Sequence, residues 1–476
     1  MVNLKILSED DKNLIHHESL KILEQAGIKL ESRKLLDMLK SKGCIVDDAE
    51  CIVKFPPDII EKALKTAPKK FILGGLEPKN DMFLGEGNSY VTTDGQSCFI
   101  YDEAKGERRE AVMQDLLDAA RIVDSLRYIN CFWPVVSASD VPEEVRTLCE
   151  LVRGYRVLGK HFQTDCFSEV QAKYYIKILE TILGSREKVI ERKIFSVVCC
   201  SVSPLSFEPE MMEGCAALTE IEVPIVILPM PISGMTAPMT MLGTIIMNNV
   251  EVLAGLAIFQ LQRPGTPVIY GSAPGSLDML TTLFCVGSPE SMLQNVASAE
   301  MGKWYELPNL VSVNCTEAKE PDIQCGREKV SGSILASMVG ADLLCGVGVA
   351  DTSNLYYPEL LVLDEDSIGY AKRLANGVKC DKEHALTDEI IQIGAFGSFL
   401  AEKSTRKFLR NGEHYHPTAT VRKSFEIWSE TPGGDVRSIA RKKVSDILAA
   451  PEKTYINDDL MARLEAILSE AEAELC

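Results

Sequence analysis

The sequence predicts an α/β protein whose main part is a (β/α)8 TIM barrel, and three observations support this. Eight short apolar runs rich in β-branched residues recur along the chain, with starts about 30 to 43 residues apart. Segments with helix-start and helix-stop residues lie between them. The runs are apolar throughout rather than alternating, which is typical of parallel strands covered on both faces. An open, doubly wound sheet is the alternative arrangement of the same units.

The predicted strands and several of the helices between them have readable limits. Ser168 is placed to cap a helix that stops at Gly184, Pro209 suits the first turn of another helix, and Ser288 opens a helix running towards Tyr305. The eight predicted strands are residues 89–101, 128–137, 161–167, 194–202, 224–231, 267–271, 309–315 and 341–346.

Helical segments are predicted on both sides of the barrel. Residues 1–88 form a helical cap, with helices expected at 8–27, at 31–42 and from Pro57 onwards. Residues 89–400 form the catalytic barrel domain, and residues 401–476 form a helical extension. Its last segment, 457–475, is an amphipathic helix capped by Asn457, expected to pack on the barrel or on a second subunit.

Charge and cysteine usage exclude several classes of protein. The chain has 50 Lys and Arg against 69 Asp and Glu, so its net charge of −19 disfavours binding to nucleic acid or to an anionic membrane. The 15 cysteines form no CxxC pair, and the N-terminal residues form no apolar signal segment, which favours reduced thiols in a cytoplasmic protein. Residues 223–250 are uncharged, but four prolines and two asparagines favour a buried strand and helix over a membrane span.

The carboxyl ends of barrel strands are where active sites of this fold lie. This rule nominates a set that combines aromatic, amide, hydroxyl and carboxylate groups with little positive charge. The set is Tyr101, Trp133, Gln163, Thr164, Asp165, Ser201, Ser203, Ser233, Thr236, Tyr270, Ser272, Asn314, Thr316, Glu317, Lys319 and Asp351.

Familiar ligand motifs are absent from the sequence. There is no P-loop, no dinucleotide-binding glycine motif, no HExxH and no GxSxG. The Gly346–Gly348 stretch follows the last strand and is either a phosphate cradle or a tight turn. His414 and His416 lack a nearby third ligand, so we expect no metal site.

Two stretches are more specific. The first runs from Ser233-Gly-Met-Thr-Ala-Pro through Gln260 to Arg263-Pro-Gly-Thr-Pro-Val-Ile-Tyr-Gly271, and the second is Gly287-Ser-Pro-Glu290. With the N-terminal Ala26-Gly27 and Pro56-Pro57 patterns, they resemble the trimethylamine methyltransferase family, in the branch that lacks pyrrolysine. The resemblance covers roughly residues 5–430.

The resemblance implies a barrel enzyme of anaerobic metabolism that moves a methyl group from a methylated amine to a Co(I) corrinoid. The corrinoid is carried by a separate protein, so this chain itself is expected to bind no cofactor. The non-pyrrolysine branch implies a quaternary amine: glycine betaine, proline betaine, carnitine or γ-butyrobetaine. Residues 316–322 are the proposed equivalent of the pyrrolysine loop.

A quaternary ammonium has no lone pair, so the protein needs only to hold the cation, desolvate it and aim one methyl group. Aromatic faces suit this task, and the candidates are Tyr90, Tyr101, Trp133, Tyr270, Tyr356 and Tyr357. Glu317 or Asp351 is expected to supply negative charge at the catalytic centre. Arg327 is expected to bind the carboxylate of the substrate, with Gln163 or Asn314 as alternatives. Gly234, Thr236 and Gly346 are expected to face the corrinoid.

Two other functions remain open on the sequence alone. One is a barrel lyase or aldolase that binds a phosphorylated substrate through Gly346 and Gly348 and uses Lys319 as a Schiff base. The other is a betaine-binding subunit without catalysis. Assembly into a homo-oligomer is expected on general grounds for an enzyme of this kind.

Overall fold

Each of the eight predicted runs contributes one strand to a closed parallel barrel in the computed structural model, which describes residues 2–476. The barrel prediction is therefore confirmed, and the open sheet is wrong. The strands, in order around the barrel, are β10 (His161–Asp165), β11 (Phe195–Cys200), β13 (Ile225–Leu228), β15 (Val268–Ser272), β18 (Asn309–Ser312), β19 (Leu343–Val347), β6 (Tyr90–Thr93) and β9 (Cys131–Phe132).

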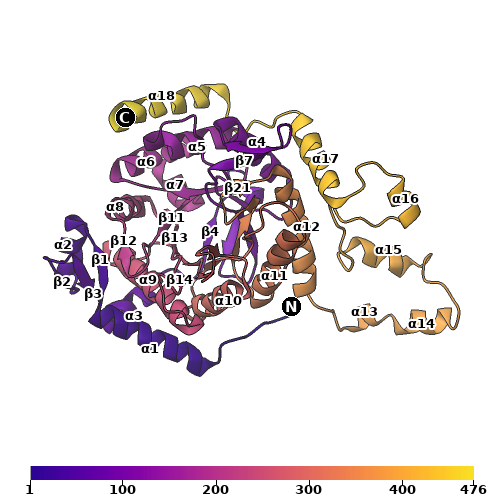
Figure 1. Cartoon of the computed structure of the whole chain (residues 1–476), viewed down its shortest axis with the longest axis horizontal. Coiled ribbons are helices and arrows are strands. Elements are labelled where there is room, and N and C mark those ends of the chain that lie inside the picture. The colour runs from indigo at the N-terminus through magenta and orange to yellow at the C-terminus, as the bar shows by residue number, and fades with distance from the viewer. Residues whose placement is uncertain (1) are drawn as a thin grey trace.

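Helices surround the barrel, as Figure 1 shows. They are α4 (Met113–Ser125), α5 (Glu143–Val157), α6 (Glu169–Leu183), α7 (Arg186–Arg192), α8 (Pro209–Leu218), α9 (Met241–Gln262), α10 (Pro289–Trp304), α11 (Ile323–Val339) and α12 (Pro358–Ala375). Their ends follow the predicted signals. The Ser168 side chain caps α6 by accepting from the Gln171 N–H, and Gly184 ends the helix with a left-handed φ of 84°. Ser288 caps α10 in the same way.

The apolar stretch 223–250 forms β13 and the first part of α9, a buried strand followed by a buried helix as predicted. Among residues 2–476, α9 is the one helix long and apolar enough to cross a membrane. In the structure 78% of its most apolar window is buried inside the protein. It packs against α10 and against two N-terminal helices, α1 (Glu9–Gln25) and α3 (Pro57–Thr66). Its composition therefore reflects a core position.

The N-terminal region holds the three predicted helices, α1, α2 (Arg33–Ser41) and α3, together with strands that the sequence did not indicate. A four-stranded sheet has the order β12 (Ser206–Phe207), β1 (Ile28–Leu30), β3 (Ile52–Lys54) and β2 (Ile45–Asp47), and β1 is the strand that pairs with β12. A second pair, β4 (Phe71–Leu73) and β5 (Met82–Leu84), is linked by the short 3-10 helix η1 (Pro78–Asn80). Strands of two or three residues are too short to show a periodic pattern.

The β4–β5 pair fills the amino end of the barrel. Leu73, Met82 and Leu84 are fully buried in one cluster with the inward-facing side chains Val198 and Leu310. Open space in the barrel therefore lies at its carboxyl end, where the strands run into longer loops.

Two small sheets are built from those loops. β7 (Phe99–Asp102) and β8 (Glu107–Glu110) join β20 (Val349–Ala350) and β21 (Leu355–Tyr356). β14 (Ile232–Ser233), β16 (Gly275–Leu277) and β17 (Phe284–Cys285) form the other. A short 3-10 helix, η2 (Thr219–Ile221), follows α8.

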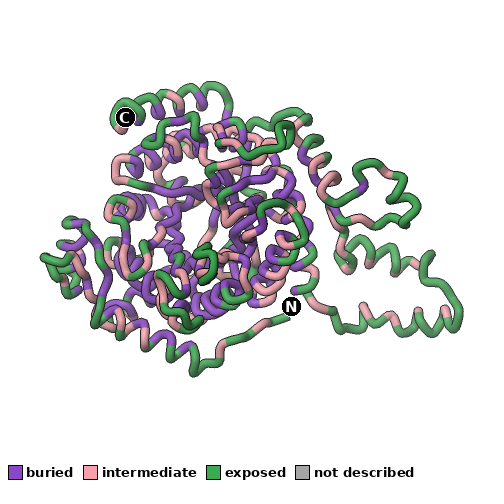
Figure 2. Tube along the Cα trace, in the orientation of Figure 1, coloured by how far each residue is buried: buried purple, intermediate pink, exposed green. Residues whose placement is uncertain are grey.

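The C-terminal region has two unlike parts. α17 (Val436–Ala449) packs on α12, and α18 (Asp458–Leu475) packs on α5 and α6, with Asn457 as its N-cap as predicted. Residues 376–435, which we call the arm, extend away from the barrel (Figure 1). The arm contains α13 (Lys382–Ala385), α14 (Thr387–Ile393), α15 (Lys403–Arg410) and α16 (Phe425–Ser429), and most of it is exposed (Figure 2).

Candidate functional site

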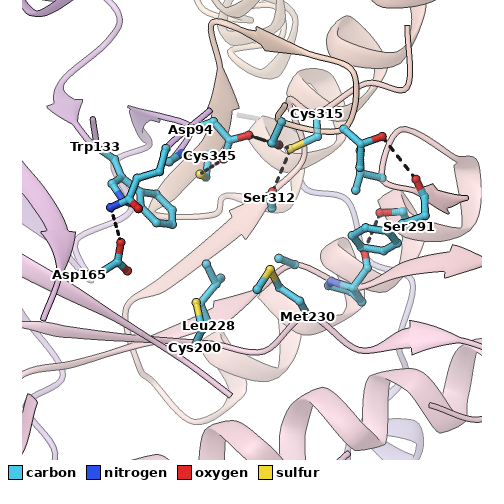
Figure 3. Close-up of a pocket in the computed structure, with 18 of the residues that line it drawn as sticks. Asp94, Trp133, Asp165, Cys200, Leu228, Met230, Ser291, Ser312, Cys315 and Cys345 are labelled. Carbon is cyan, nitrogen blue, oxygen red and sulfur yellow. Dashed lines mark hydrogen bonds between the residues drawn. The ribbon is translucent and has the colours of Figure 1, made fainter. Parts of the chain in front are cut away.

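A cavity of about 450 Å³ opens at the carboxyl ends of the barrel strands (Figure 3). Residues at or just after all eight strands line it, so the position follows directly from the fold. The lining residues are Asp94, Gly95, Gln96, Trp133, Asp165, Phe167, Cys200, Met211, Leu228, Met230, Ala273, Pro274, Phe284, Val286, Ser291, Ser312, Cys315, Cys345, Thr352 and Ser353.

Asp165 is the last residue of β10 and points into this cavity. The Gln96 side-chain amide donates a hydrogen bond of 2.7 Å to its carboxylate. Burial raises the pKa of Asp165 from 3.8 to about 7, because a charged carboxylate loses hydration in the cavity wall. The group is therefore poised to ionise at neutral pH, and a bound cation would favour its charged form.

Asp94 directly follows β6 and lies on the same side of the cavity as Asp165, because only β9 separates β6 from β10 in the barrel (Figure 3). It accepts a hydrogen bond from the Gly95 N–H at 3.0 Å and another from the Ser353 hydroxyl. The thiols of Cys315 and Cys345 each lie 3.7 Å from its oxygens as donors. Since burial raises the pKa of the Cys315 thiol to about 12, the thiol keeps its proton for this contact at neutral pH.

Trp133 lies between the two acids on the wall of the cavity. Among the described residues its indole N–H has no hydrogen-bond partner at normal geometry, but it acts on the Asp165 carboxylate, whose pKa it lowers against the effect of burial. Gly95 packs against the ring so closely that a Cβ atom would come within 2.3 Å of it. Glycine is therefore required at position 95 for the indole to occupy this place.

The remaining walls are largely apolar, and none of the lining residues is Lys, Arg or His. Phe167, Phe284, Leu228, Met211 and Met230 supply carbon and sulfur surface. Two carboxylates and an aromatic ring in a mostly apolar cavity suit an organic cation.

The structure places the predicted substrate-binding residues in several different environments. Trp133 lines the cavity. Gln163 precedes Asp165 by two residues on β10, so its side chain also faces the barrel interior, one layer deeper. Its side-chain oxygen accepts from the Ser196 hydroxyl at 3.3 Å, while its amide nitrogen has no partner among the described residues. Gln163 is the second predicted residue close to the cavity.

The predicted tyrosines lie elsewhere. Tyr90 begins β6 at the amino end of the barrel, where its hydroxyl accepts from the Phe83 N–H. Tyr101 lies on β7 and stacks on Tyr357, with ring centroids 5.0 Å apart. Tyr270 is buried and donates to the Asn249 side chain on α9, outside the barrel wall. Tyr356 is buried on β21, and its hydroxyl has no partner among residues 2–476. None of the four lines the cavity.

The predicted charged and amide residues are engaged outside the cavity. Glu317 accepts from the Gly287 N–H, and burial raises its pKa. Asp351 forms an ion pair with the exposed Lys319. Asn314 accepts from the Ser333 hydroxyl. The Arg327 side chain on α11 is 73% exposed and pairs with Glu328.

The three residues predicted to face the corrinoid also separate into two groups. Gly234 and Thr236 lie in the loop after β13, beside exposed methionines. Gly346 is buried instead, and its carbonyl accepts from Lys329, which forms a buried ion pair with Asp364.

The Gly348 N–H donates to Asp364, so the Gly346–Gly348 stretch is a turn whose polar groups are already satisfied. The phosphate cradle that the sequence left open is not formed here. Lys319, the Schiff-base candidate, is absent from the cavity lining.

Asp94 is the site residue that sequence reasoning missed. The sequence predicts a first strand over residues 89–101, which puts its carboxyl end at Tyr101. The strand ends at Thr93, and residues 95–98 lead into the separate strand β7. The Asp94–Gly95 pair was the available signal, since an acidic residue and a glycine commonly follow a strand at a turn.

Among residues 2–476 no group of three His, Cys, Asp or Glu side chains is placed to hold a metal ion. His414 and His416 lie in the arm.

Comparison with known proteins finds methylamine and betaine methyltransferases as relatives of this chain. A family model described as trimethylamine methyltransferase (MTTB) matches residues 1–476. The chain is 30% identical over 477 residues to trimethylamine methyltransferase MttB of Methanosarcina barkeri (strain Fusaro / DSM 804), covering 99% of this chain and 96% of the relative. It is 27% identical over 472 residues to the glycine betaine methyltransferase of Desulfitobacterium hafniense (strain Y51), covering 99% and 98%.

Among solved structures, the monomethylamine methyltransferase MtmB of Methanosarcina barkeri superposes with a TM-score of 0.53. The match has 14% sequence identity and covers 93% of this chain and 88% of that one. At this identity the likeness concerns the barrel fold alone.

Proposed function

This chain belongs to the trimethylamine methyltransferase (MTTB) family and is a methyltransferase, and on that premise we propose that it demethylates a quaternary amine. The methyl acceptor is the Co(I) corrinoid of a cognate partner protein, and the reaction takes place in the cytoplasm. The observation that carries the proposal is the cavity at the carboxyl ends of the strands. It offers Trp133, Asp94 and Asp165 to a cation and no side chain of positive charge.

The chemistry asks little of the chain beyond binding and orientation. The bond between the methyl carbon and nitrogen breaks and leaves its electron pair on nitrogen, so a tertiary amine is the leaving group. The new bond between the methyl carbon and cobalt is formed by an electron pair of the Co(I) acceptor. No proton needs to move on the donor. The residues of the cavity hold the ammonium, exclude water and direct one methyl group towards the mouth.

Positive charge leaves the nitrogen during the reaction, so an excessively strong ion pair would stabilise the substrate more than the transition state. The environment of Asp94 limits this effect. Its oxygens are already shared with the Gly95 N–H, the Ser353 hydroxyl and two thiols. Asp165 is partly protonated near neutral pH because burial raises its pKa to about 7. Both acids therefore attract the cation moderately.

The rim of the cavity supports the approach of a partner's corrinoid. Four apolar side chains in the loops after β13 and β15 are strongly exposed: Met235 at 68%, Met239 at 60%, Met279 at 66% and Leu280 at 94%. A Cβ atom on Gly234 would contact the sulfurs of both Met239 and Met279, which places the two loops side by side. Exposed apolar patches of this kind mark interaction sites, and a flat, largely apolar macrocycle suits such a rim. The chain itself is proposed to bind no resident cofactor.

The betaines implied by the sequence resemblance are members of the proposed substrate class. The glycine betaine methyltransferase of Desulfitobacterium hafniense, as a relative, supports them. Proline betaine, glycine betaine, carnitine and γ-butyrobetaine therefore belong in any substrate panel.

Self-association is also part of the proposal. The arm exposes the large apolar side chains Ile391, Phe396, Leu400, Phe425 and Ile427. Burial against a second copy would remove this surface from water. Sedimentation of the purified chain, compared with a variant carrying Phe396→Glu and Leu400→Glu, tests this part, and a wild-type monomer would contradict it.

The methyl transfer is tested with purified protein, its cognate corrinoid protein held in the Co(I) state, and a panel of quaternary amines. A change of the absorption spectrum from that of Co(I) to that of methyl-Co(III), caused by at least one donor, supports the proposal. Binding of a donor without spectral change would instead indicate a binding subunit without catalysis. Trapping of a substrate carbonyl on Lys319 by borohydride would indicate the lyase alternative.

A further inference from the structure

We propose that the quaternary amine taken by this cavity carries no carboxylate, and that its fourth substituent is a neutral alkyl or hydroxyalkyl group, as in choline. The inference rests on the proposed function and narrows its substrate class. It separates this chain from an enzyme for zwitterionic betaines.

The first argument is the charge of the lining. A betaine brings one positive and one negative group, and each needs its own complement. The cavity supplies two carboxylates, Asp94 and Asp165, and no Lys, Arg or His. A substrate carboxylate would enter a largely apolar space beside like charges without a counter-ion, which is strongly unfavourable. A plain cation meets only complementary charge.

The second argument is the supply of hydrogen-bond donors, since neutral donors sometimes replace a counter-ion. The side-chain amide and hydroxyl groups that line this cavity are already engaged, including Ser312, which contacts the Cys315 thiol, and Thr352, which donates to the Phe284 carbonyl. The Gln96 amide donates to Asp165, the Ser353 hydroxyl donates to Asp94, and the Ser291 hydroxyl donates to the Pro274 carbonyl.

The Trp133 indole N–H is the exception, because it makes no hydrogen bond of normal geometry among the described residues and interacts only weakly with Asp165. One neutral N–H is enough for a hydroxyl oxygen. A desolvated carboxylate normally takes several donors or a bidentate guanidinium.

The third argument concerns the nearest arginine. A neighbouring cavity of about 510 Å³ shares Gln96 and Phe167 with the first and contains Arg146. Its guanidinium is engaged by the Val141 carbonyl at 3.2 Å, and Glu143, Glu144, Glu150 and Glu210 line the same space. Arg146 is therefore outnumbered by carboxyl groups, and the Gln96–Asp165 hydrogen bond lies between the two cavities.

The test uses ligands matched in size and different in charge. Choline and glycine betaine share the trimethylammonium group and the two-carbon chain, and n-butyltrimethylammonium and γ-butyrobetaine form a longer pair with four carbons each. Isothermal titration calorimetry on the full chain without the corrinoid protein measures binding directly. We expect each plain cation to bind at least about tenfold more tightly than its zwitterionic partner.

Variants separate the possible results. Asp94→Asn and Asp165→Asn, checked for folding by circular dichroism, should weaken choline binding about tenfold or more, and Arg146→Ala should leave it unchanged. Tighter binding of the betaine, with its loss in Arg146→Ala, would establish a carboxylate subsite and overturn the inference.

A second measurement needs no variant. Because a cation favours ionised Asp165, choline binding to the wild-type chain at pH 6.5 should release protons. Titrations in buffers of different ionisation enthalpy report this release, and its absence counts against the inference.

Failure of the proposed function gives a different pattern. Tight choline binding with no methylation of the partner's cobalt would contradict the proposed methyl transfer. It would still agree with the proposed preference for plain cations over zwitterions. Methyl transfer from betaines in preference to choline would support the proposed methyl transfer and contradict the proposed preference for plain cations. No binding of any ammonium compound would overturn both.

Discussion

The Gln96 side-chain amide donates a 2.7 Å hydrogen bond to the carboxylate of Asp165. The contact joins the loop after β6 to the end of β10, two places 69 residues apart in the chain. It holds the acid at the cavity wall and partly compensates its burial. Five predictions concern this contact, the groups around it and the rim.

The affinity of the chain for a quaternary cation should depend on pH through Asp165. Burial places the pKa of this carboxyl at about 7, and the cation prefers the ionised form. Affinity should therefore rise as the pH rises, by about tenfold between pH 6 and pH 8. Calorimetric titration of choline over this range measures the effect. In Asp165→Asn the slope should disappear, and an unchanged slope would show that another group titrates.

Replacing Gln96 by Met removes the donor to Asp165 while keeping the side-chain length. The buried carboxylate then loses a hydrogen bond that favours its charged form, so its pKa rises further. We expect the midpoint of the pH dependence to move upwards and affinity at pH 7 to fall several-fold. At pH 9 the variant and the wild type should converge. A uniform loss at all pH values would instead indicate a general disturbance of the site.

Asp165→Asn should also stabilise the ligand-free protein. In the folded protein the Asp165 carboxyl keeps its proton to about pH 7, against 3.8 as its ordinary value, so the folded state binds more protons between these values. Stability from this group therefore falls as pH rises through that window and is lowest above pH 7. The gain in unfolding free energy should be about 1–3 kcal/mol at pH 8 and smaller at pH 5.

Thermal unfolding at both pH values measures this gain. Asp351→Asn is the matched control, because Asp351 pairs with an exposed lysine, and an exposed pair is worth at most about 1 kcal/mol. Equal gains for Asp165→Asn at pH 5 and pH 8 would be inconsistent with ionisation as the cause.

Trp133→Ala should weaken cation binding by about 5- to 30-fold, as expected for loss of a desolvated cation–π contact worth about 1–2 kcal/mol. Trp133→Phe should recover part of this loss. Tyr101→Ala is the control, since Tyr101 stacks on Tyr357 outside the cavity. Equal effects of the two alanine variants on choline affinity would remove Trp133 from the proposed binding site.

The exposed methionines at the rim of the cavity, Met235 and Met279, should affect docking of the corrinoid protein and not binding of the small substrate. Met235→Glu together with Met279→Glu places two charges on side chains that are 68% and 66% exposed, so the fold should tolerate them. We expect the apparent KM for the corrinoid protein to rise at least about tenfold while the dissociation constant for choline is unchanged. Ile45→Glu, at a side chain on β2 that is 59% exposed and far from the barrel mouth in the fold, is the control for methyl transfer. A double variant with normal KM would show that the partner docks elsewhere.

The sequence determined the barrel and the position of its active end. Strands buried on both faces must be apolar at every position, and helices between them must start and stop with capping residues and glycines. Both requirements are local, so all eight strands, the burial of α9 and the C-terminal helix could be predicted from the order of residues. The rule that sites lie at the carboxyl ends of the strands nominated Trp133 and Asp165 for the same reason.

Only the tertiary structure decided which of the nominated side chains meet. Tyr101 and Trp133 both belong to predicted strand segments, yet one lies on an outer sheet and the other lines the cavity. The difference depends on where β6 ends, and a turn at Asp94 is fixed by contacts with Ser353, Cys315 and Cys345, which are distant in the chain. The charge of the cavity likewise arises from Asp94 and Asp165, which lie at the ends of two different strands, β6 and β10. A sequence pattern records local periodicity, whereas a binding site is a sum of contacts across the barrel, and closure of the barrel brings them together.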